Sequence, residues 1–338
     1  MAVRQLPDDR WPRFRQPPLP ARDGDPPRLL GADDIEALGP TGAVDALAAA
    51  LSEGLDPETS QARHHVTVPG GELLIMPATT QRVTGVKIAG VAPGNPAHGL
   101  PRITGSYLLL DGPTLLPLAL LDGAALTTLR TPAVSALAIR HLTGPVLRHL
   151  VLFGTGPQAY GHLAAVHAER RVERVTVIGR TPHRVAALVE HARGLGMDAR
   201  AGEAHGPQEV ATADLVICCT TSETPLFDGT LVPDGAVVVA VGSHTPEARE
   251  VDTALVSRSA VFVESRAAAL SEAGDLLIPM AEGAFGTDDI TGTLADLVAG
   301  RNLGGKPDVR ERPRFFKSVG MGWEDLAIAA AVYRDSAL

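Results

Sequence analysis

One short segment, Gly154-Thr155-Gly156-Pro157-Gln158-Ala159, constrains the fold of this chain more than any other feature. It directly follows the apolar run 150–153 and opens a helical pattern over 157–169. Between a strand and a helix, this spacing predicts a dinucleotide-binding turn, because the first glycine permits a tight turn and the second lets backbone N–H groups approach a pyrophosphate. Ala159, in the third position, is small enough for close packing of helix on strand, and the helix N-terminus favours negative phosphates. The alternative is a strand–helix turn that binds nothing.

The second half of the chain continues this alternation of strands and helices. Apolar runs predict strands at 150–153, 175–178, 213–219, 236–241 and 260–263, and helical patterns occupy 157–169 and 182–194. Strands that are apolar on both faces and alternate with helices predict a doubly wound parallel sheet, covered on both sides. We therefore expect an α/β fold with a Rossmann dinucleotide-binding lobe over residues 129–317.

The first half of the chain has a different pattern. Residues 1–28 are rich in proline and predict an extended arm. Helical patterning then runs from residue 32 to 51, broken at Gly39-Pro40, with Asp33 or Asp34 as the expected N-cap. Short β segments at 66–68, 73–76, 83–88, 107–110 and 116–121 predict a mostly antiparallel sheet whose last two strands form a hairpin.

Two further helices are expected to connect the lobes. Thr131-Pro132 is expected to open a helix over 133–142, and a final helix over 323–333 follows the α/β pattern and returns to the first lobe. The sequence thus predicts a Pro-rich arm (1–28), an α+β dimerisation and substrate lobe (29–128 with 318–338) and the Rossmann lobe between its two parts.

The overall charge and composition exclude several classes of partner. The formal net charge of −9 is spread over 338 residues without a Lys/Arg-rich block, which argues against nucleic-acid binding. No apolar run reaches the roughly 20 residues of a membrane-spanning helix, and the N-terminus lacks the pattern of a secretion signal. No His and Cys residues occur at zinc-binding spacing, so no metal site is expected. We expect a cytoplasmic protein that binds small molecules.

The residues after the second Rossmann strand bear on which dinucleotide binds. An Asp or Glu there would accept from the adenosine ribose, whereas an arginine pairs with a 2′-phosphate. This chain has Gly179-Arg180-Thr181 and no acid. NADPH is therefore the favoured cofactor, with NADH possible if Arg180 is only a solvated residue at a helix start.

Further motifs occur in one order along the chain: Asn95-Pro96, Gly99-Leu100-Pro101, 118–123, Leu129-Arg130-Thr131, 154–159 and 316–321. Together they resemble the ornithine cyclodeaminase/mu-crystallin family over residues 29–333. The resemblance implies a homodimer and a substrate site in which Arg63, Lys87 and Arg130 face the nicotinamide and hold an α-carboxylate. It also implies substrate contact by Met76 and cofactor contact by Thr220, Thr221, Val241 and Ser318.

The three cations make physical sense at these positions, although each has a simpler explanation. Lys87 interrupts an apolar strand, where an ammonium is costly unless it is paired or faces a polar cleft, and an edge strand would be the alternative. Arg130 has a guanidinium that can bind a carboxylate with two parallel hydrogen bonds, or form a salt bridge between the lobes. Arg63 precedes a strand and would otherwise be solvated.

The chain departs from the cyclodeaminase members at two positions. His244 stands where those members carry a catalytic aspartate, and Leu74 stands where a glutamate is expected. The mu-crystallin branch is similar in lacking the aspartate, and that branch reduces cyclic ketimines. The predicted reaction is therefore hydride transfer from NAD(P)H to the C=N carbon of an imino acid, such as Δ1-pyrroline-2-carboxylate or Δ1-piperideine-2-carboxylate.

Two residues are candidates for the proton donor to the imine nitrogen, namely Lys87 and His244, whose ordinary pKa suits transfer near neutrality. His244 could instead be a loop histidine bonded to backbone. Three other functions stay open at this point: an ornithine or lysine cyclodeaminase that forms proline or pipecolate, an alanine-dehydrogenase-like or opine-type oxidoreductase, and a non-catalytic NADP(H)-binding protein.

Overall fold

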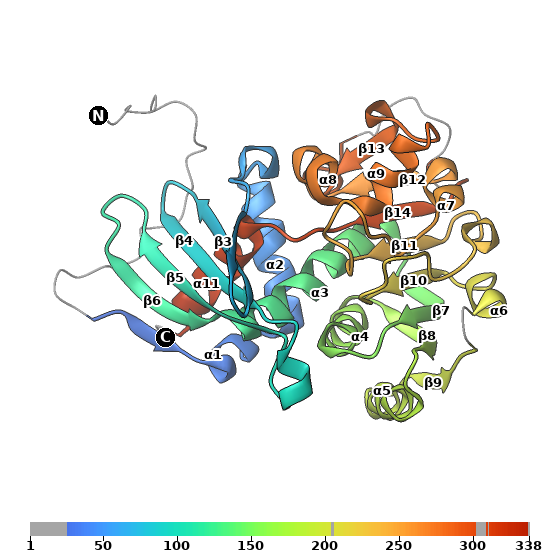
Figure 1. Ribbon diagram of the computed structural model, residues 1–338, viewed down its shortest axis with the longest axis horizontal. Coiled ribbons are helices and arrows are strands. Elements are labelled where there is room, and N and C mark those ends of the chain that lie inside the picture. The colour runs from blue at the N-terminus through green and yellow to red at the C-terminus, as the bar shows by residue number, and fades with distance from the viewer. Residues whose placement is uncertain (1–25, 204–205, 302–308, 310, 337–338) are drawn as a thin grey trace.

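The computed structural model describes residues 26–203, 206–301, 309 and 311–336. Residues 1–25 of the predicted Pro-rich arm lie outside this range. Its last residue, Arg28, already belongs to strand β1 (Arg28–Leu30), which pairs parallel to β6 (Pro117–Asp122). The described chain forms two β-sheets with their helices, seen on the left and right of Figure 1.

The first sheet has six strands in the order β1-β6-β5-β4-β3-β2. Its other strands are β2 (His64–Val68), β3 (Gly71–Thr79), β4 (Val83–Val91) and β5 (Ile103–Asp111), all paired antiparallel and joined to β6 in the same way. Inward-facing residues alternate with outward-facing ones along each strand, as the period of two requires. The predicted antiparallel sheet and its β5–β6 hairpin are confirmed.

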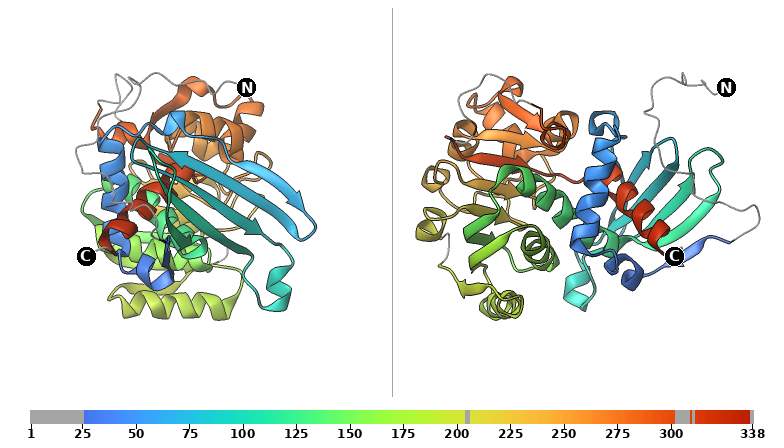
Figure 2. Two further views of the ribbon diagram at one scale, coloured as in Figure 1. Left: turned by 90° about the vertical axis from the view of Figure 1, so that its left-hand side faces the viewer. Right: turned by 180° about the vertical axis from the view of Figure 1, so that it is seen from behind.

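Register across this sheet places three side chains in one row on its inner face. Lys87 on β4 lies opposite Met76 on β3 and opposite Tyr107 on β5, and all three are buried. Helix α11 (Gly322–Asp335) packs against β3 and β4, and α2 (Gly39–Ser52) packs against α11. Figure 2 shows both helices between this sheet and the other lobe. The inner face is therefore shielded from solvent by the C-terminal helix, which returns to the first lobe.

The second sheet is parallel, with eight strands in the order β13-β12-β14-β11-β10-β7-β8-β9. Its central strands are buried at every position because helices cover both faces, which explains their continuous apolar runs. The doubly wound fold is confirmed. The strands are β7 (Val146–Phe153), β8 (Arg171–Ile178), β9 (Asp198–Ala201), β10 (Leu215–Cys218), β11 (Val237–Ala240), β12 (Ala260–Val263), β13 (Ile290–Thr293) and β14 (Arg314–Lys317).

The helices of this lobe lie close to their predicted ranges. Predicted 157–169 and 182–194 are α4 (Pro157–Glu169) and α5 (Pro182–Gly194). The remaining helices of this lobe are α6 (Pro207–Val210), α7 (Thr253–Arg258), α8 (Arg266–Glu272), α9 (Gly274–Ala281) and α10 (Leu294–Val298), with short 3₁₀ turns η4 (Gly229–Leu231) and η5 (Thr287–Asp289). The first lobe has the 3₁₀ turns η2 (Pro57–Thr59) and η3 (Asn95–His98).

The start of helix α3 (Gly123–Leu142) corrects the sequence prediction. Asp122 caps it by accepting from the N–H groups of Ala124 and Ala125, so the helix begins ten residues before the predicted Ala133 and contains Pro132. Pro132 lacks the N–H that would bond to the Thr128 carbonyl. That carbonyl and the proline ring lie against Gly161 of α4, where any side chain would collide with them. The predicted lobe boundary at 128/129 thus falls inside a continuous helix.

The N-cap of α1 (Ala32–Glu36) is also corrected. Gly31 is the cap residue, and Asp34 accepts from its N–H at 2.8 Å. Asp34 therefore contributes from the first turn of the helix, as the second half of a capping box does, and Asp33 is not the cap.

Candidate functional site

The predicted cofactor turn has the backbone that a bound pyrophosphate needs. Gly154 follows β7 with a φ of +117°, and its N–H donates to the Ile178 carbonyl at 2.9 Å. A Cβ at Gly154 would lie 2.4 Å from the Cys219 carbonyl oxygen, so only glycine fits. Gly156 is the N-cap of α4, and no atom lies within 4 Å of the place where its Cβ would be. The helix N-terminus is thus open, and these residues fit a pyrophosphate.

The other predicted cofactor residues, in this turn and after β8, differ in their surroundings. Thr155 packs its methyl group against Gly179 at the end of β8, where a Cβ would lie only 2.7 Å away. Ala159 is fully buried, as close helix–strand packing predicts. Arg180 is exposed and has no hydrogen bond or ion pair among the described residues, and Thr181 is the N-cap residue of α5. Arg180 is therefore free to meet a ligand.

A buried carboxylate holds the two loops that carry Thr220, Thr221 and Val241. Glu250 accepts from the N–H and the hydroxyl of Thr220 at 2.7 Å each, and from the Gly242 N–H at 2.7 Å. Burial raises the pKa of Glu250, and nearby Lys317 opposes this rise. Asp275 accepts from the Glu250 N–H and lies 2.9 Å from the Lys317 ammonium. The Glu250 carboxylate therefore fixes these two loops, which lie at the carboxyl ends of β10 and β11.

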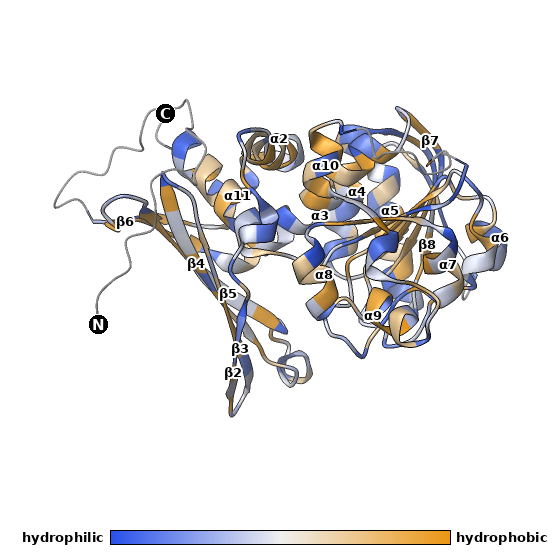
Figure 3. Ribbon diagram, turned by 90° about the horizontal axis from the view of Figure 1, so that it is seen from above, coloured by the Kyte–Doolittle hydropathy of each residue, from blue (hydrophilic) through white to orange (hydrophobic). Residues whose placement is uncertain are grey.

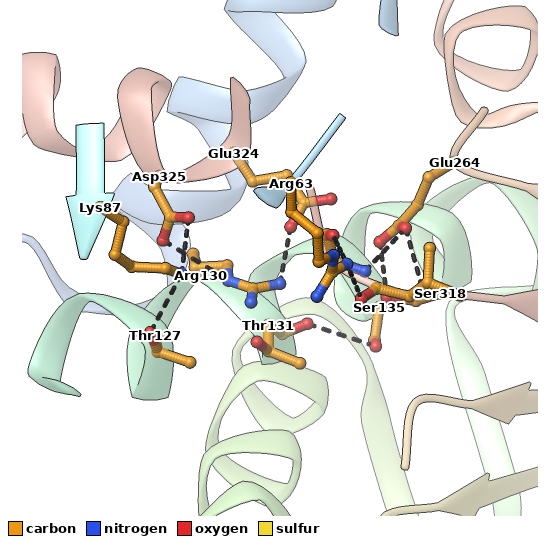
Figure 4. Close-up of polar contacts among 12 residues, drawn as sticks. Arg63, Lys87, Thr127, Arg130, Thr131, Ser135, Glu264, Ser318, Glu324 and Asp325 are labelled. Carbon is orange, nitrogen blue, oxygen red and sulfur yellow. Dashed lines mark hydrogen bonds and ion pairs between the residues drawn. The ribbon is translucent and has the colours of Figure 1, made fainter. Parts of the chain in front are cut away.

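Two of the three predicted substrate cations meet acidic residues of helix α11 (Figure 4). The Nζ of Lys87 lies 2.6 Å from Oδ2 of Asp325, and Arg130 Nη1 lies 2.8 Å from Oε2 of Glu324. Arg130 Nε is also 3.6 Å from Oδ1 of Asp325. Lys87 is 2% exposed and Arg130 8%, whereas both acids are fully buried. The structure thus brings Lys87 and Arg130 into one buried cluster, with Arg130 inside α3 rather than before a helix.

Burial and neighbouring charges act in opposite directions in this cluster. Burial lowers the pKa of Lys87 to about 8, although Asp325 raises it, and Arg130 lowers it further. Burial alone would lower the pKa of Arg130, but Glu324 and Asp325 outweigh this effect and raise it. Burial, followed by the neighbouring Glu264, raises the pKa of Glu324 well above its ordinary value. The lysine is therefore the cation of this cluster that can exchange a proton near neutral pH.

Arg63 reaches the same region from the loop before β2. It lies 2.8 Å from Oε2 of Glu272 on α8, and its Nη2 donates to the carbonyls of Val319 and Gly320 at 2.8 and 2.6 Å. Gly320 also underlies Arg130, since a Cβ there would be 2.4 Å from Nη1 of that arginine. The segment before α11 thus links the two arginines.

A cavity of about 210 Å³ lies between the lobes beside Arg63. Met76 lines it together with Gly320 and residues of α8, among them Glu272. Glu58 crosses the same junction and accepts from the N–H groups of Arg266 and Ala267 at the start of α8. The predicted contact residues Arg63 and Met76 therefore share one interlobe cavity.

Ser318 is buried and bonded within the protein. Its hydroxyl donates to Glu264 at 2.5 Å, and the other oxygen of Glu264 accepts from the N–H groups of Val319 and Gly320. In this structure Ser318 helps to fix the turn before α11.

His244 lies on the loop after β11, with an exposed side chain. Lys317 donates to the carbonyl of the preceding Ser243 at 2.6 Å and so anchors the loop. Although part of the side chain is accessible to water, the protein atoms around it desolvate the imidazole, and this desolvation, with the positive charges of Arg63 and Lys317, lowers the pKa of His244 to about 4. The imidazole is therefore neutral at pH 7, which weakens the expectation that it donates a proton near neutrality.

One residue of α3 links the cofactor turn to the buried cations. Gln158 of the turn donates a long hydrogen bond of 3.5 Å to the Thr127 carbonyl, and the Thr127 hydroxyl accepts from Lys87 at 3.2 Å. Thr127 thus connects the dinucleotide turn to the lysine, although Lys87 and Gly154 are 67 positions apart in the sequence.

The acidic partners of the cations were not predicted from the sequence. Glu324 and Asp325 are adjacent acids at the start of an otherwise apolar helical segment, Gly322–Tyr333, whose residues are mostly buried. Two neighbouring charges in such a segment are the signal that could have identified them, because charges inside a core need partners.

The part of the chain that the structure describes holds neither a metal-binding cluster nor a membrane-spanning helix. There, no group of three or more His, Cys, Asp or Glu side chains could hold a metal ion. None of the helices within the same ranges has the length and apolar character to cross a membrane.

Comparisons with known proteins agree with this architecture. A family model for the ornithine cyclodeaminase/mu-crystallin family matches residues 38–337. The chain is 38% identical over 267 residues to a Delta(1)-pyrroline-2-carboxylate reductase of Colwellia psychrerythraea, covering 76% of this chain and 82% of the relative. It is 36% identical over 267 residues to a Delta(1)-pyrroline-2-carboxylate/Delta(1)-piperideine-2-carboxylate reductase of Azospirillum brasilense, covering 79% and 81%.

A solved structure extends the likeness to nearly the whole chain. The Thermococcus litoralis Delta(1)-pyrroline-2-carboxylate reductase in complex with NADH and L-proline matches with a TM-score of 0.85 at 30% identity, over 92% of this chain and 97% of that one. The resemblance predicted from the ordered motifs is confirmed, and the chain belongs to the ornithine cyclodeaminase/mu-crystallin family.

Proposed function

We propose that this protein reduces the C=N bond of a cyclic imino acid, Δ1-pyrroline-2-carboxylate or Δ1-piperideine-2-carboxylate, with a nicotinamide dinucleotide as hydride donor. The observation that carries the proposal is the contact chain from Gln158 through Thr127 to Lys87. It puts a buried amine beside the cofactor turn and next to Arg130. The similarity to reductases of these two imines supports the substrate class.

The chain's own residues account for binding and for the proton. Arg130 and Arg63, which flank Gly320, hold the α-carboxylate of the imine and thereby orient its ring. The nicotinamide, when bound, supplies the hydride that goes to the C=N carbon. Lys87 gives a proton to the imine nitrogen, so that one hydride and one proton convert the imine to a secondary amine. Its pKa of about 8 leaves it largely protonated at pH 7, whereas His244, with a pKa of about 4, is not.

The direct test is oxidation of NADPH or NADH by the purified protein with either imine. We expect turnover by the unmodified chain and none by Lys87→Ala, with dinucleotide binding, followed by fluorescence, retained. Arg171→Ala is a matched control, because it also removes a cation from a strand but its side chain is 77% exposed. Failure of the unmodified protein to turn over either imine would reject this substrate class.

NADPH is the proposed preferred dinucleotide. Arg180 supports it, because this exposed arginine stands at the end of β8 without a partner among the described residues and without an acid beside it. Arg180→Glu should raise the KM for NADPH and lower that for NADH, which reverses the ratio of the two. An unchanged ratio would mean that Arg180 does not contact the adenosine ribose.

A homodimer is proposed through the outer face of the six-stranded sheet. In Figure 3 the helices α2 and α11 lie on one side of this sheet, and no helix of the described chain covers the other. That uncovered face exposes Leu29 (78%), Ile88 (47%) and Leu120 (40%). Large apolar side chains exposed on one uncovered face of a sheet are typical of a protein interface.

Light scattering coupled to size exclusion tests the assembly. The unmodified chain should elute as a dimer, and the double change Ile88→Glu with Leu120→Glu should produce a monomer. Leu100→Glu is the control, because Leu100 is 55% exposed but lies outside the sheet. A monomeric unmodified protein would overturn this assembly.

A further inference from the structure

Asp325 is the closest polar neighbour of the proposed proton donor. Its Oδ2 lies 2.6 Å from the Nζ of Lys87, and neither side chain is more than 2% exposed. Lys87 is held on β4 by the pairing of its strand with β3 and β5, and Asp325 is held in the first turn of α11, which packs on the same strands. Both partners are therefore fixed by the backbone, so the ion pair has a defined geometry.

A second contact restricts the rotation of the amine. The Thr127 hydroxyl donates to the Gly123 carbonyl at 2.8 Å, so a lone pair of its oxygen faces Lys87, whose Nζ donates to it at 3.2 Å. An ammonium has three N–H groups. Asp325 and Thr127 take two of them, and the third has no partner within the described residues. The two contacts thus leave one N–H group for a ligand and set its direction.

The other groups around the amine show why the charge of Asp325 is needed. Arg130 of α3 adds a positive charge, and Glu324 of α11 is engaged with that arginine. Tyr107 of β5 faces Lys87 from the next strand, and burial, followed by the charge of Asp325, raises the pKa of its hydroxyl well above 10, so it stays neutral. Burial and Arg130 both disfavour the charged lysine, and Asp325 is the largest influence that favours it.

We propose that Asp325 is a positioning residue for the imine reduction proposed above: its carboxylate orients the Nζ of Lys87 and keeps this amine protonated, so that the free N–H group is delivered to the imine nitrogen. The inference rests on the proposed function. Asp325 itself does not touch the imine and acts only through Lys87.

Asp325→Asn tests the inference through the pH dependence of kcat/KM. The amide can still accept a hydrogen bond, but it no longer offers a negative charge to the lysine. Because an opposite charge at this distance shifts a pKa by about 1 to 3 units, the high-pH decline of kcat/KM should move from near pH 8 to lower pH by at least about one unit. Asp335→Asn is the matched control, since it makes the same change at the exposed end of the same helix.

A purely structural role gives a different result. In that case Asp325→Asn would lower kcat at all pH values and lower the unfolding temperature without moving the decline, and the proposal would be overturned. If Asp325→Asn does not fold, Asp325→Glu decides: the decline should stay near pH 8 while the plateau of kcat falls, because the longer side chain displaces Nζ. An unchanged plateau in this variant would equally overturn the proposal. Absence of turnover in the unmodified protein would instead count against the proposed function.

Discussion

Arg63 and Glu272 form an ion pair of 2.8 Å across the two lobes, so an arginine proposed to hold the substrate carboxylate already contacts a carboxylate of the protein. Glu272 is only partly buried; burial raises its pKa, and Arg63 opposes this rise. A substrate carboxylate must therefore compete with Glu272 for the guanidinium or share it. This competition is a measurable property of the site.

Glu272→Gln should strengthen binding of the imino acid. Removing the competing charge leaves Arg63 available, and because a partly exposed ion pair is worth up to about 1 kcal/mol, the KM should fall by up to about fivefold. Steady-state kinetics at varied imine concentration measure this change. Glu190→Gln, which removes an exposed i,i+3 ion pair with Arg193, is the control and should leave KM unchanged. A higher KM in Glu272→Gln would show that the ion pair positions Arg63 for the substrate rather than competing with it.

The pH profile of the unmodified protein separates the two candidate proton donors. A donor must be protonated, so kcat/KM falls as pH rises through its pKa. With Lys87 as donor the decline is expected near pH 8, and with His244 as donor it would begin near pH 4. His244→Asn should therefore keep both the decline near pH 8 and most of the activity. Loss of activity in His244→Asn together with a decline at acidic pH would assign the proton to the histidine.

The raised pKa of Glu324 predicts that this residue contributes to the stability of the fold in a pH-dependent way. Its pKa is raised well above the ordinary value in the fold, so the folded state binds this proton more tightly than the unfolded chain. The contribution is present below the unfolded pKa of about 4.3 and is lost as pH rises toward the folded pKa. The glutamine of Glu324→Gln resembles the protonated form of Glu324 at every pH. The stability of this variant relative to the unmodified protein should therefore increase as pH rises.

The gain should appear in unfolding temperatures measured at pH 5 and pH 8. Because only the protonated form is stabilised by the fold, the unfolding temperature of Glu324→Gln should rise relative to that of the unmodified protein between pH 5 and pH 8. Asp335→Asn serves as the comparison, with an expected difference that does not depend on pH. A pH-independent effect of Glu324→Gln would contradict the raised pKa.

The two glycines of the cofactor turn should respond differently to alanine. A Cβ at Gly156 meets open space, so Gly156→Ala should fold with nearly normal stability and lose dinucleotide affinity, because the methyl group occupies the pyrophosphate site. Gly154→Ala places a Cβ 2.4 Å from a backbone oxygen at a φ of +117° and should cost about 1 to 3 kcal/mol of folding stability in addition. Thermal unfolding and fluorescence titration with NADPH distinguish the two effects. Equal affinity of Gly156→Ala and the unmodified chain would place the pyrophosphate elsewhere.

Local sequence patterns predicted most of the fold because most of the fold depends on them. Buried strands such as β10 are continuous apolar runs, and the 157–169 helix has its glycine turn before it. Strand β14 was missed because its four residues, Arg314–Lys317, begin and end with cations whose partners lie elsewhere. The start of α3 was misplaced because proline normally opens a helix, whereas here Gly161 of α4 makes room for the Thr128 carbonyl that Pro132 leaves unbonded.

For each ion pair of the site, the sequence predicted the cation but not its acidic partner. Family motifs identify Lys87 and Arg130, but their acids lie far along the chain, 194 residues away for Arg130 and Glu324. Nothing local at Glu324 indicates which cation it meets. The lowered pKa of His244 was also beyond local patterns, because it follows from desolvation by the surrounding protein and then from Arg63 and Lys317, which only the fold brings near.

Helix α3 gives the two ligands of this protein a common support. The same helix carries Thr127 and Arg130, which lie at the proposed imine site, and packs along α4, which begins at the dinucleotide turn. A displacement of α3 by one ligand would therefore move residues beside the site of the other. By thermodynamic linkage such an influence must be mutual: the factor by which the dinucleotide changes the dissociation constant of the amino or imino acid equals the factor by which that acid changes the dissociation constant of the dinucleotide.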